Sequence, residues 1–323
     1  MEAHRLILTS GGTEANNLAI FGLLSPQGKL VVGATEHPSV LQSAAKCLAT
    51  DLPVTFLSVD KNGYYCIDQL VDVLSPLSSL QRSGSLVSLM LANNETGIVQ
   101  DLKSIVDVCH SLGVRCHSDV VQAVGKIPFD LCASGLDAIS VSAHKIHGPV
   151  GVGALILGPE LTPKPIMFGG AQQLEARPGT ESVALCAAMA AALEVCLAAL
   201  QAGQYDQLAL HREMFEKLLV SEANAYIVGQ DSLRLPTTSN IAFEPIDRQA
   251  LLMALDLERL ACSTGSACAS GSGRPSHVLT AMGLDHAIVQ SALRFSFSRF
   301  SSLEAILLGA ERILTTVKRI RGK

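Results

Sequence analysis

Short apolar runs alternate with amphipathic stretches through the first half of the chain. The apolar runs are rich in β-branched residues and are predicted as strands at 29–34, 54–59, 86–92, 114–117 and 138–141. The stretches between them are predicted as helices at 13–24, 39–48, 67–74 and 102–112. Such alternation is typical of an α/β fold with a mostly parallel central sheet flanked by helices.

The pattern changes near residue 200. A nearly continuous apolar run at 183–200 is rich in alanine and interrupted by Glu194, so we predict a buried helix rather than a membrane span. Beyond residues 201–203 the pattern becomes a looser α+β mixture. We therefore expect a large domain at 1–200 and a smaller C-terminal domain at 201–323.

Composition supports a globular enzyme-like protein and argues against a nucleic-acid partner. The chain has 323 residues, of which 48% are hydrophobic, enough to bury a large core in two domains. The net charge is −5, and the longest basic cluster lies at 318–321. Trp is absent and aromatic residues make up 4%, which leaves few side chains for base stacking.

Nine scattered cysteines do not form the regular spacing of a disulfide framework, which indicates a reducing compartment. The first residues lack the apolar core of a signal peptide. We expect a soluble, cytoplasmic protein without a membrane partner. The pairs Cys109-His110 and Cys116-His117 have metal-binding side chains, but they fall on a predicted helix and a buried strand, so no metal site is expected.

Lys145 follows the apolar strand at 138–141 and precedes a break at Gly148-Pro149. A lysine near the end of a buried strand loses hydration, its pKa falls, and its neutral amine can condense with an aldehyde. A surface lysine in a turn is the alternative.

Polar motifs follow other predicted strands, and the carboxyl ends of parallel strands meet at one edge of a sheet. His37 can face a cofactor ring, or simply be hydrogen-bonded in its loop. Asn93 and Asn94 can bind a carboxylate or form a turn. Asp119, with Gln122 one turn later, can hold a pyridine nitrogen or cap a helix.

Small residues at 9–14 lie between a short apolar strand and a predicted helix. Gly11 and Gly12 permit close backbone approach, and Thr13 can cap the helix and donate to a phosphate. The segment predicts an anion cradle or an ordinary capped glycine turn. It is not a Walker loop, because no Gly-Lys-Ser/Thr follows.

The second half adds two candidates. The small-residue segment at 262–273 contains Cys262 and Cys268, and such a loop suits a mobile nucleophile better than a core cysteine. Arg294 lies in an alternating strand, where an inward arginine needs an anion; an edge ion pair is the alternative. The loop at 177–181, which contains Thr180, reads by itself as a turn and a capping box.

Eight motifs occur in order along the chain and together resemble one family. They are Thr-Ser-Gly-Gly-Thr-Glu, Thr-Glu-His, Asn-Asn-Glu-Thr-Gly, Asp-x-x-Gln, Ser-x-His-Lys, Arg-x-Gly-Thr, Gly-Ser-Ala-Cys and Leu-Arg-Phe-Ser. This series closely resembles the pyridoxal 5'-phosphate (PLP)-dependent cysteine desulfurases of the class V aminotransferase group. The glycine-rich cysteine segment is similar to the long-loop branch that serves iron–sulfur cluster assembly.

The resemblance implies a PLP fold type I homodimer and assigns roles to the candidate residues. Lys145 would bind the cofactor aldehyde covalently and move protons at the substrate Cα. Asp119 would pair with the ring nitrogen, Gln122 with the ring hydroxyl, and His37 would stack on the ring and assist acid–base steps. The remaining positions would bind anions. The phosphate would be bound by Gly12, Thr13, Ser142 and His144, with Thr180 from the second subunit. The substrate carboxylate would be bound by Asn94 and Arg294.

The implied reaction converts L-cysteine to L-alanine. The Cys268 thiolate would attack the substrate sulfur and keep it as a persulfide for a sulfur-acceptor or scaffold protein. Cys262 matches no catalytic position of the family.

Three alternatives remain open: a selenocysteine lyase, a related PLP aminotransferase, and a catalytically impaired, truncated homologue. The last is considered because the family has a substantial segment before the glycine turn, whereas Met1 lies eight residues before Thr9. Val120-Val121 also replaces a smaller pair between Asp119 and Gln122.

Overall fold

The structure is a computed structural model that describes residues 4–265 and 274–322. The chain forms two compact units, and each is described by itself. The first contains residues up to Ser58, Tyr65–Ala92 and Gln100–Ala198. The second contains the chain from Ala199 onward together with two short segments from the first half, Val59–Tyr64 and Asn93–Val99.

Among the described residues of the first unit, seven strands form one sheet in the order β1-β7-β6-β5-β4-β2-β3. Of these seven described strands, only β7 runs antiparallel to its neighbours, so the predicted mostly parallel sheet is confirmed. The elements of this unit are β1 (Arg5–Thr9), α1 (Gly12–Leu23), β2 (Leu30–Gly33), α2 (Pro38–Leu48), β3 (Val54–Leu57), α3 (Ile67–Leu74), α4 (Ser79–Gly84), β4 (Leu86–Ser88), α5 (Leu102–Ser111), β5 (Arg115–Asp119), α6 (Leu131–Ser134), β6 (Ala138–Ser142), the 3₁₀ turn η1 (Ala143–Ile146), β7 (Gly153–Leu157) and α7 (Val183–Gln201).

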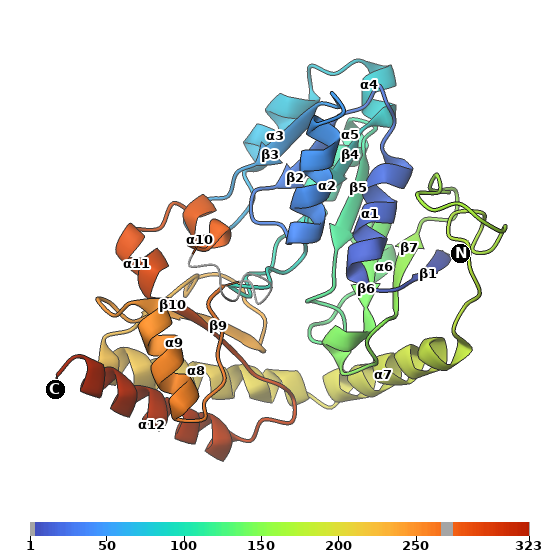
Figure 1. Cartoon of the computed structure of the whole chain (residues 1–323). Helices are drawn as coiled ribbons and strands as arrows, with labels where there is room; N and C mark the ends of the chain where they lie inside the picture. The colour runs from blue at the N-terminus through green and yellow to red at the C-terminus, as the bar shows by residue number, and fades with distance from the viewer. Residues whose placement is uncertain (1–3, 266–273, 323) are drawn as a thin grey trace. The chain divides into compact units, whose positions relative to one another are not determined.

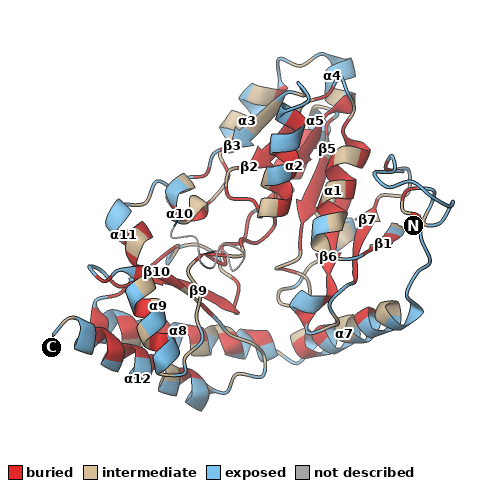
Figure 2. Cartoon of the chain, viewed as in Figure 1, coloured by how far each residue is buried: buried red, intermediate tan, exposed pale blue. Residues whose placement is uncertain are grey.

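Helices α1 and α2 lie side by side in front of this sheet in Figure 1. The apolar face of α1, including Leu18 and Ile20, packs with Leu30 and Leu155 of the strands in one buried cluster. Figure 2 shows the strands largely in red, the colour of buried residues. Burial on both faces explains why these strands read as continuous apolar runs in the sequence.

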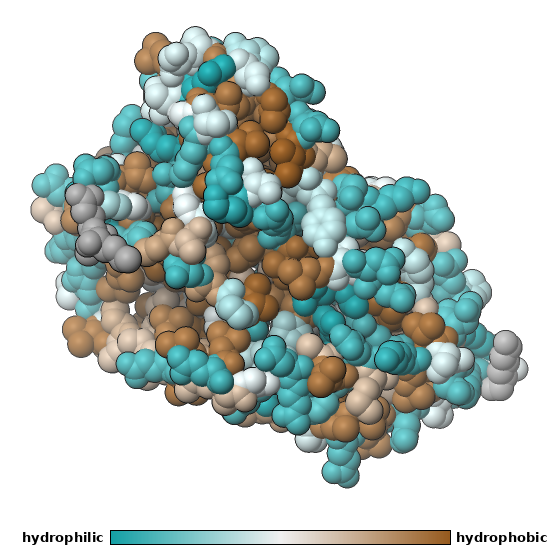
Figure 3. Space-filling model, turned by 180° about the vertical axis from the view of Figure 1, so that it is seen from behind, coloured by the Kyte–Doolittle hydropathy of each residue, from teal (hydrophilic) through white to brown (hydrophobic). Residues whose placement is uncertain are grey.

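Helix α7 departs from the sequence prediction. The helix at 183–200 is present, but the expectation that it is buried is wrong for the single chain, because most of its residues are exposed. Val195 and Leu197 are 52% and 56% exposed. Brown, apolar residues gather over this part of the surface in Figure 3. By length and composition α7 is the one helix in the described part of the chain that could cross a membrane.

The second unit is an α+β structure, as predicted. Its described strands form an antiparallel sheet in the order β10-β9-β8, and helices α8, α9 and α12 share its apolar core. The elements are α8 (Gln204–Ala223), β8 (Tyr226–Ile227), β9 (Thr238–Ala242), α9 (Arg248–Leu257), α10 (His277–Ala281), α11 (His286–Ser291), β10 (Ala292–Ser296) and α12 (Leu303–Ile320).

A buried ionic cluster centred on Glu216 ties α8 to the chain before β9. Arg234 donates to both carboxylate oxygens of Glu216, at 2.6 and 2.9 Å, and the Ser239 hydroxyl donates to the same carboxylate at 2.6 Å. The side chains of Arg234 and Glu216 are only 4% and 8% exposed. A charge pair so well shielded from water must remain complete, since either partner alone would be an uncompensated buried charge.

We predict that Glu216→Ala lowers the free energy of unfolding of the second unit by about 3–5 kcal/mol, because it leaves Arg234 charged and buried. Urea denaturation followed by circular dichroism measures this loss. Glu213→Ala on the same helix is the matched control, since Glu213 is half exposed and lies 4.0 Å from Arg212; its effect should stay below about 1 kcal/mol. Equal losses in the two variants would contradict the structural role given to the cluster.

Candidate active site

The candidate residues of the first unit gather at the carboxyl ends of neighbouring parallel strands. Asp119 is the last residue of β5 and Ser142 the last of β6, and the two strands pair directly. Lys145 follows within the turn η1. The parallel direction of the strands therefore places these side chains at one edge of the sheet, as the sequence predicted.

The glycine turn between β1 and α1 lies against the end of β6. A Cβ added to Gly12 would lie 3.0 Å from a methyl group of Val121, and one added to Gly11 would lie 3.7 Å from the Ser142 hydroxyl. Gly11 has a φ of 154°, and no side chain of the described residues caps the first turn of α1. Amide groups at this helix start are thus available to an anion, and bare backbone leaves it room.

Ser142 and His144 are hydrogen-bonded to each other beside this turn, with 2.8 Å between the Ser142 hydroxyl and Nδ1 of His144. Partial burial, with the charges of Lys145 and Lys126, lowers the pKa of His144. Neutral His144 and the Ser142 hydroxyl have two donor protons between them; one joins the two residues, and the other can donate to a phosphate oxygen. The phosphate-binding candidates that one chain supplies therefore lie together; they are Gly12, Thr13, Ser142 and His144.

Asp119 is buried and firmly held. Its carboxylate accepts hydrogen bonds from Nδ2 of Asn16 at 2.7 Å and from the backbone N–H of Val121 at 3.0 Å. Burial raises the pKa of Asp119, while these hydrogen bonds and the charges of His37 and Lys145 oppose the rise. A carboxyl group in this position suits a protonated ring nitrogen, which would supply the positive charge that the buried carboxylate needs.

His37 is the N-cap of α2, so it is hydrogen-bonded within its loop, which is one of the two roles that the sequence allowed. Its Nδ1 accepts from the backbone N–H of Ser39 at 3.1 Å and lies 2.8 Å from the Ser39 hydroxyl. The same hydroxyl accepts from Asn16, which also binds Asp119. His37 is thus linked to Asp119 by a hydrogen-bonded path, and its ring orientation is fixed by the cap.

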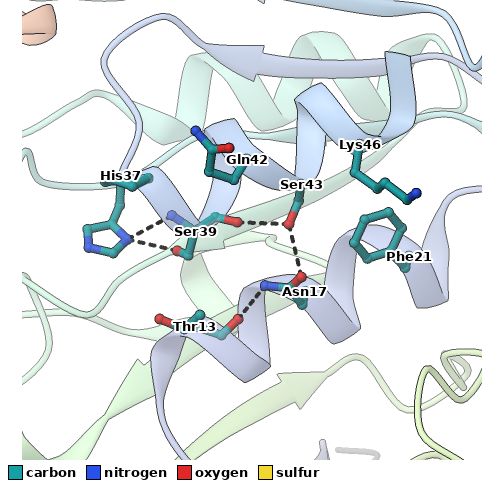
Figure 4. Close-up of a pocket in the computed structure, with 9 residues that line it drawn as sticks. Thr13, Asn17, Phe21, His37, Ser39, Gln42, Ser43 and Lys46 are labelled. Atoms are coloured by element: carbon teal, nitrogen blue, oxygen red, sulfur yellow. Dashed lines mark hydrogen bonds between the residues drawn. The ribbon is translucent and has the colours of Figure 1, made fainter. Parts of the chain in front are cut away.

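A groove of about 400 Å³ leads away from this site between α1 and α2. Figure 4 shows Thr13 and His37 at one end of it and Phe21 and Lys46 toward the other. Ser43 of α2 and Asn17 of α1 both line the groove, and the Ser43 hydroxyl donates to Oδ1 of Asn17 at 3.2 Å. The position of Thr13 and His37 makes the groove an extension of the candidate site.

The side chain of Lys145 is exposed in the single chain. The expectation that a buried strand end would strip its amine of water is therefore wrong for this chain alone, because η1 turns the lysine out of the sheet. Its charge nevertheless acts on Asp119, His144 and Lys126. Lys145 thus lies among the candidate residues, although burial by its own strand does not explain its chemistry.

Lys126 is a member of the site that the sequence did not indicate. Its Nζ donates to Oε1 of Gln122 at 2.8 Å, one turn earlier in the chain. In the sequence, the one sign of this contact is the four-residue spacing of Gln122 and Lys126 in the segment after β5. Such spacing is too common to be distinctive.

Glu36 is the second such residue. It is fully buried and accepts hydrogen bonds from the Tyr65 hydroxyl and from the backbone N–H of Met90, both at 2.7 Å. Burial, assisted by the charge of Asp119, raises the pKa of Glu36 to about 8. Glu36 is therefore mainly a neutral acid at pH 7. The sequence shows only a glutamate beside His37, a residue type usually found in solvent.

Thr180 is exposed in a loop of the first unit, and Arg177 anchors that loop to α1. Nε of Arg177 donates to Glu14 at 2.8 Å, and the Ser10 N–H donates to the same carboxylate at 2.7 Å. The Thr-Ser-Gly-Gly-Thr-Glu and Arg-x-Gly-Thr motifs are thus joined by a direct ion pair.

Asn94 and Arg294 lie in the second unit. Arg294 donates to the backbone carbonyl oxygen of Asn94 at 2.9 Å, so the two candidates for carboxylate binding are neighbours. Asn93 forms the turn that the sequence allowed, because its Oδ1 accepts from the N–H groups of Glu95 and Thr96.

Cys268 lies outside the described residues. Burial raises the pKa of the Cys262 thiol to about 12, which agrees with a structural role.

The second unit also contains Glu95, which the sequence reading did not single out. Its buried carboxylate accepts from the Ser276 hydroxyl at 2.5 Å and lies 2.8 Å from the position that a Cβ on Gly265 would occupy. Ser276 is thus hydrogen-bonded to this carboxylate, and Gly265 lies so close to it that a side chain there would collide.

The histidine of Cys116-His117 has a structural role. His117 lies between Ser88 and Ser140 with 2.9 Å to each hydroxyl, and burial lowers its pKa to about 3. Within residues 4–265 and 274–322, no cluster of three metal-binding side chains occurs.

The sequence matches the family Aminotransferase class-V over residues 1–307. This chain therefore belongs to the class V aminotransferases, which are PLP-dependent enzymes. Its relatives include the cysteine desulfurase of Gluconacetobacter diazotrophicus, 38% identical over 92% of this chain and 74% of the relative. The cysteine desulfurase of Homo sapiens is 35% identical over 99% of this chain and 70% of the relative.

Solved structures agree. The NifS-like protein from Rickettsia africae superposes with a TM-score of 0.87 at 30% identity, covering 100% of this chain and 83% of that one. A second NifS-like protein gives 0.84 at 27% identity, covering 96% and 82%. A structure described as SspA in complex with cysteine gives 0.75 at 28%, covering 92% and 82%. The family resemblance and the fold type I expectation are confirmed.

The geometry fits PLP. The uncapped glycine turn beside Ser142 and His144 suits the phosphate, and buried Asp119 suits the ring nitrogen. Lys145 lies close enough for its charge to act on Asp119. Anion site, buried carboxyl group and amine are the three protein groups that this cofactor requires.

We predict that Glu36→Gln makes the protein more stable relative to wild type as the pH rises from 4.5, the ordinary pKa of glutamate, to about 8. In this window folded wild type keeps a proton that the unfolded chain has released, so rising pH destabilises it by at most about 1.4 kcal/mol per pH unit. Glutamine mimics the neutral acid and removes this dependence.

Urea midpoints of the cofactor-free protein between pH 5 and about 8 test this linkage. Exposed Glu160 supplies the control: Glu160→Gln should track wild type at each pH. A constant stability difference between Glu36→Gln and wild type across the window would show that Glu36 is ionised throughout.

Proposed function

We propose that this protein is a PLP-dependent cysteine desulfurase that converts L-cysteine to L-alanine and keeps the sulfur as a persulfide on Cys268. The observation that carries the proposal is the grouping of Asp119, His37 and Lys145 next to the open glycine turn. Similarity to cysteine desulfurases over nearly the whole chain supports the choice of substrate.

The residues of the 1–200 domain would bind and orient the cofactor. Gly12, Thr13, Ser142 and His144 hold the phosphate, Asp119 keeps the proton on the ring nitrogen, and Gln122 donates to the ring hydroxyl. His37, whose ring is fixed by its cap on α2, stacks on the ring. When bound, PLP withdraws electrons from the substrate Cα and makes its proton acidic.

The substrate carboxylate would be bound by Asn94 and Arg294 of the 201–323 domain and its associated segments. Lys145, once its amine is displaced, removes the proton from Cα and later returns one. The Cys268 thiolate attacks the substrate sulfur, so an S–S bond forms as the C–S bond breaks. The electron pair of the C–S bond stays with carbon, which is protonated and leaves as alanine.

We propose that the protein acts as a homodimer in the cytoplasm, without a membrane partner. The exposed apolar residues of α7, a helix too apolar to remain in water unpartnered, favour a second copy as their cover. A partner's Thr180 would then complete the phosphate site. The persulfide sulfur would pass to an acceptor or scaffold protein, as in iron–sulfur cluster assembly.

The activity is tested with purified protein, PLP, L-cysteine and a thiol reductant, which reduces the persulfide and frees its outer sulfur as sulfide. Wild type should release alanine and sulfide and develop a yellow absorbance, and borohydride should fix the cofactor on Lys145, as seen by mass spectrometry. Lys145→Ala should lose the absorbance and the mass increase. Cys268→Ala should keep both, but its rate of sulfur release should fall roughly a thousandfold, because the nucleophile is absent.

Other products would identify the alternatives. A keto acid in place of alanine would indicate an aminotransferase. Full Cys268→Ala activity on L-cysteine would contradict the persulfide route, and turnover of L-selenocysteine alone would indicate a selenocysteine lyase. Wild type without the absorbance would indicate an impaired homologue.

The dimer is tested by placing a charge on α7. Leu197→Glu should convert the dimer to a monomer in analytical ultracentrifugation, since burying an unpaired carboxylate costs several kcal/mol. Leu210→Glu on α8 is the control, because Leu210 is equally exposed at 60% but lies outside α7. A dimeric Leu197→Glu protein would exclude α7 from the interface.

A further inference from the structure

Lys126 occupies a crowded position between the candidate cofactor site and α7. The preceding Gly125 is so close to its surroundings that an added Cβ would lie 2.9 Å from Cβ of Cys196 and 3.0 Å from a methyl group of Ile146. The backbone before Lys126 is therefore fixed between α7 and η1. From this position its Nζ reaches Oε1 of Gln122 at 2.8 Å.

The chemistry of lysine decides which end of the Gln122 amide it binds. A protonated lysine has three donors and no acceptor, whereas the amide offers an oxygen that accepts and a nitrogen that donates. Lys126 in this form can bind only the oxygen. The amide is thereby held in one of its two flipped orientations, with Nε2 directed away from Lys126.

We propose that Lys126 is a positioning residue that fixes the Gln122 amide so that Nε2 donates to the ring hydroxyl oxygen of the cofactor. This inference rests on the proposed function, which places that oxygen at Gln122. Without Lys126, the amide would be divided between two orientations, one of which turns an acceptor toward the ring oxygen.

The charge state of Lys126 makes this contact dependent on pH. Burial, followed by the charge of Lys145, lowers the pKa of Lys126 to about 7. The titratable groups that act on Lys126 are Lys145 on η1 and Cys196 on α7. Partial burial and the charges of Lys145 and Lys126 lower the pKa of His144. Neutral lysine has a lone pair and can accept from Nε2, so selection of the oxygen weakens as the pH rises above about 7.

The test compares two compounds that differ only in the ring hydroxyl group: PLP and 3-deoxypyridoxal 5'-phosphate. Their dissociation constants are measured by equilibrium dialysis with cofactor-free protein at about pH 6, where Lys126 is protonated. Lys126→Met should weaken PLP binding about fivefold to tenfold, as expected for one misdirected hydrogen bond, and leave the 3-deoxy compound unchanged. Lys126→Arg, whose guanidinium has only donors, should restore much of the preference.

Two further variants control the comparison. Lys103→Met removes an exposed lysine of the same unit that pairs with Asp107, and it should bind both compounds as wild type does. In a Gln122→Ala background, Lys126→Met should have no further effect on the preference, since the amide that it orients is absent.

The outcomes separate this inference from the function on which it rests. If Lys126→Met weakens both compounds equally, or neither, Lys126 does not act through the ring hydroxyl contact and the inference is overturned. A wild-type protein that binds neither compound would instead overturn the proposed function itself. Circular dichroism of each variant establishes that it is folded before binding is measured.

Discussion

The buried carboxyl group of Asp119 at the end of β5 is the constraint around which the first unit is organised. It is held by Asn16 of α1 and by the backbone after β5, and Asn16 also binds Ser39 beside His37. Helices α1 and α2 must therefore pack on the sheet in one register for the carboxyl group to keep its partners. A buried acid is costly without a cation, which explains why the site suits a protonated ring.

Two further buried ionisable groups of the first unit have shifted pKa values: Glu36, on which the charge of Asp119 acts, and Lys126, on which the charge of Lys145 acts. The pKa of Glu36 is raised to about 8, so this acid is mainly neutral at pH 7, and the pKa of Lys126 is lowered to about 7, so its charge changes near neutral pH. Residues of this kind reduce stability and concentrate at functional sites. The second unit contrasts with this arrangement, since its Glu216 cluster satisfies its charges with two arginines and has a structural role.

The single chain leaves part of its apolar surface exposed to water. Helix α7 is as apolar as a membrane-spanning helix, yet most of its residues are exposed. Thr180 lies in an exposed loop, anchored by the ion pair of Arg177 with Glu14. A second copy that covers α7 and receives this loop would satisfy both features, so assembly and cofactor binding would depend on each other.

The sequence by itself determined the order of five strands and four helices, the mostly parallel sheet and the positions of Asp119 and Lys145, because local periodicity and the ends of parallel strands follow from short-range patterns. The antiparallel strand β7 and the short helices α4 and α6 were not predicted. It also determined the family, through motifs kept in order. Tertiary structure alone decided that Glu36 is buried beside Tyr65, that Lys126 reaches Gln122, that Lys145 is exposed and that α7 is uncovered. Burial and pairing depend on residues distant in the chain, and no local pattern encodes them.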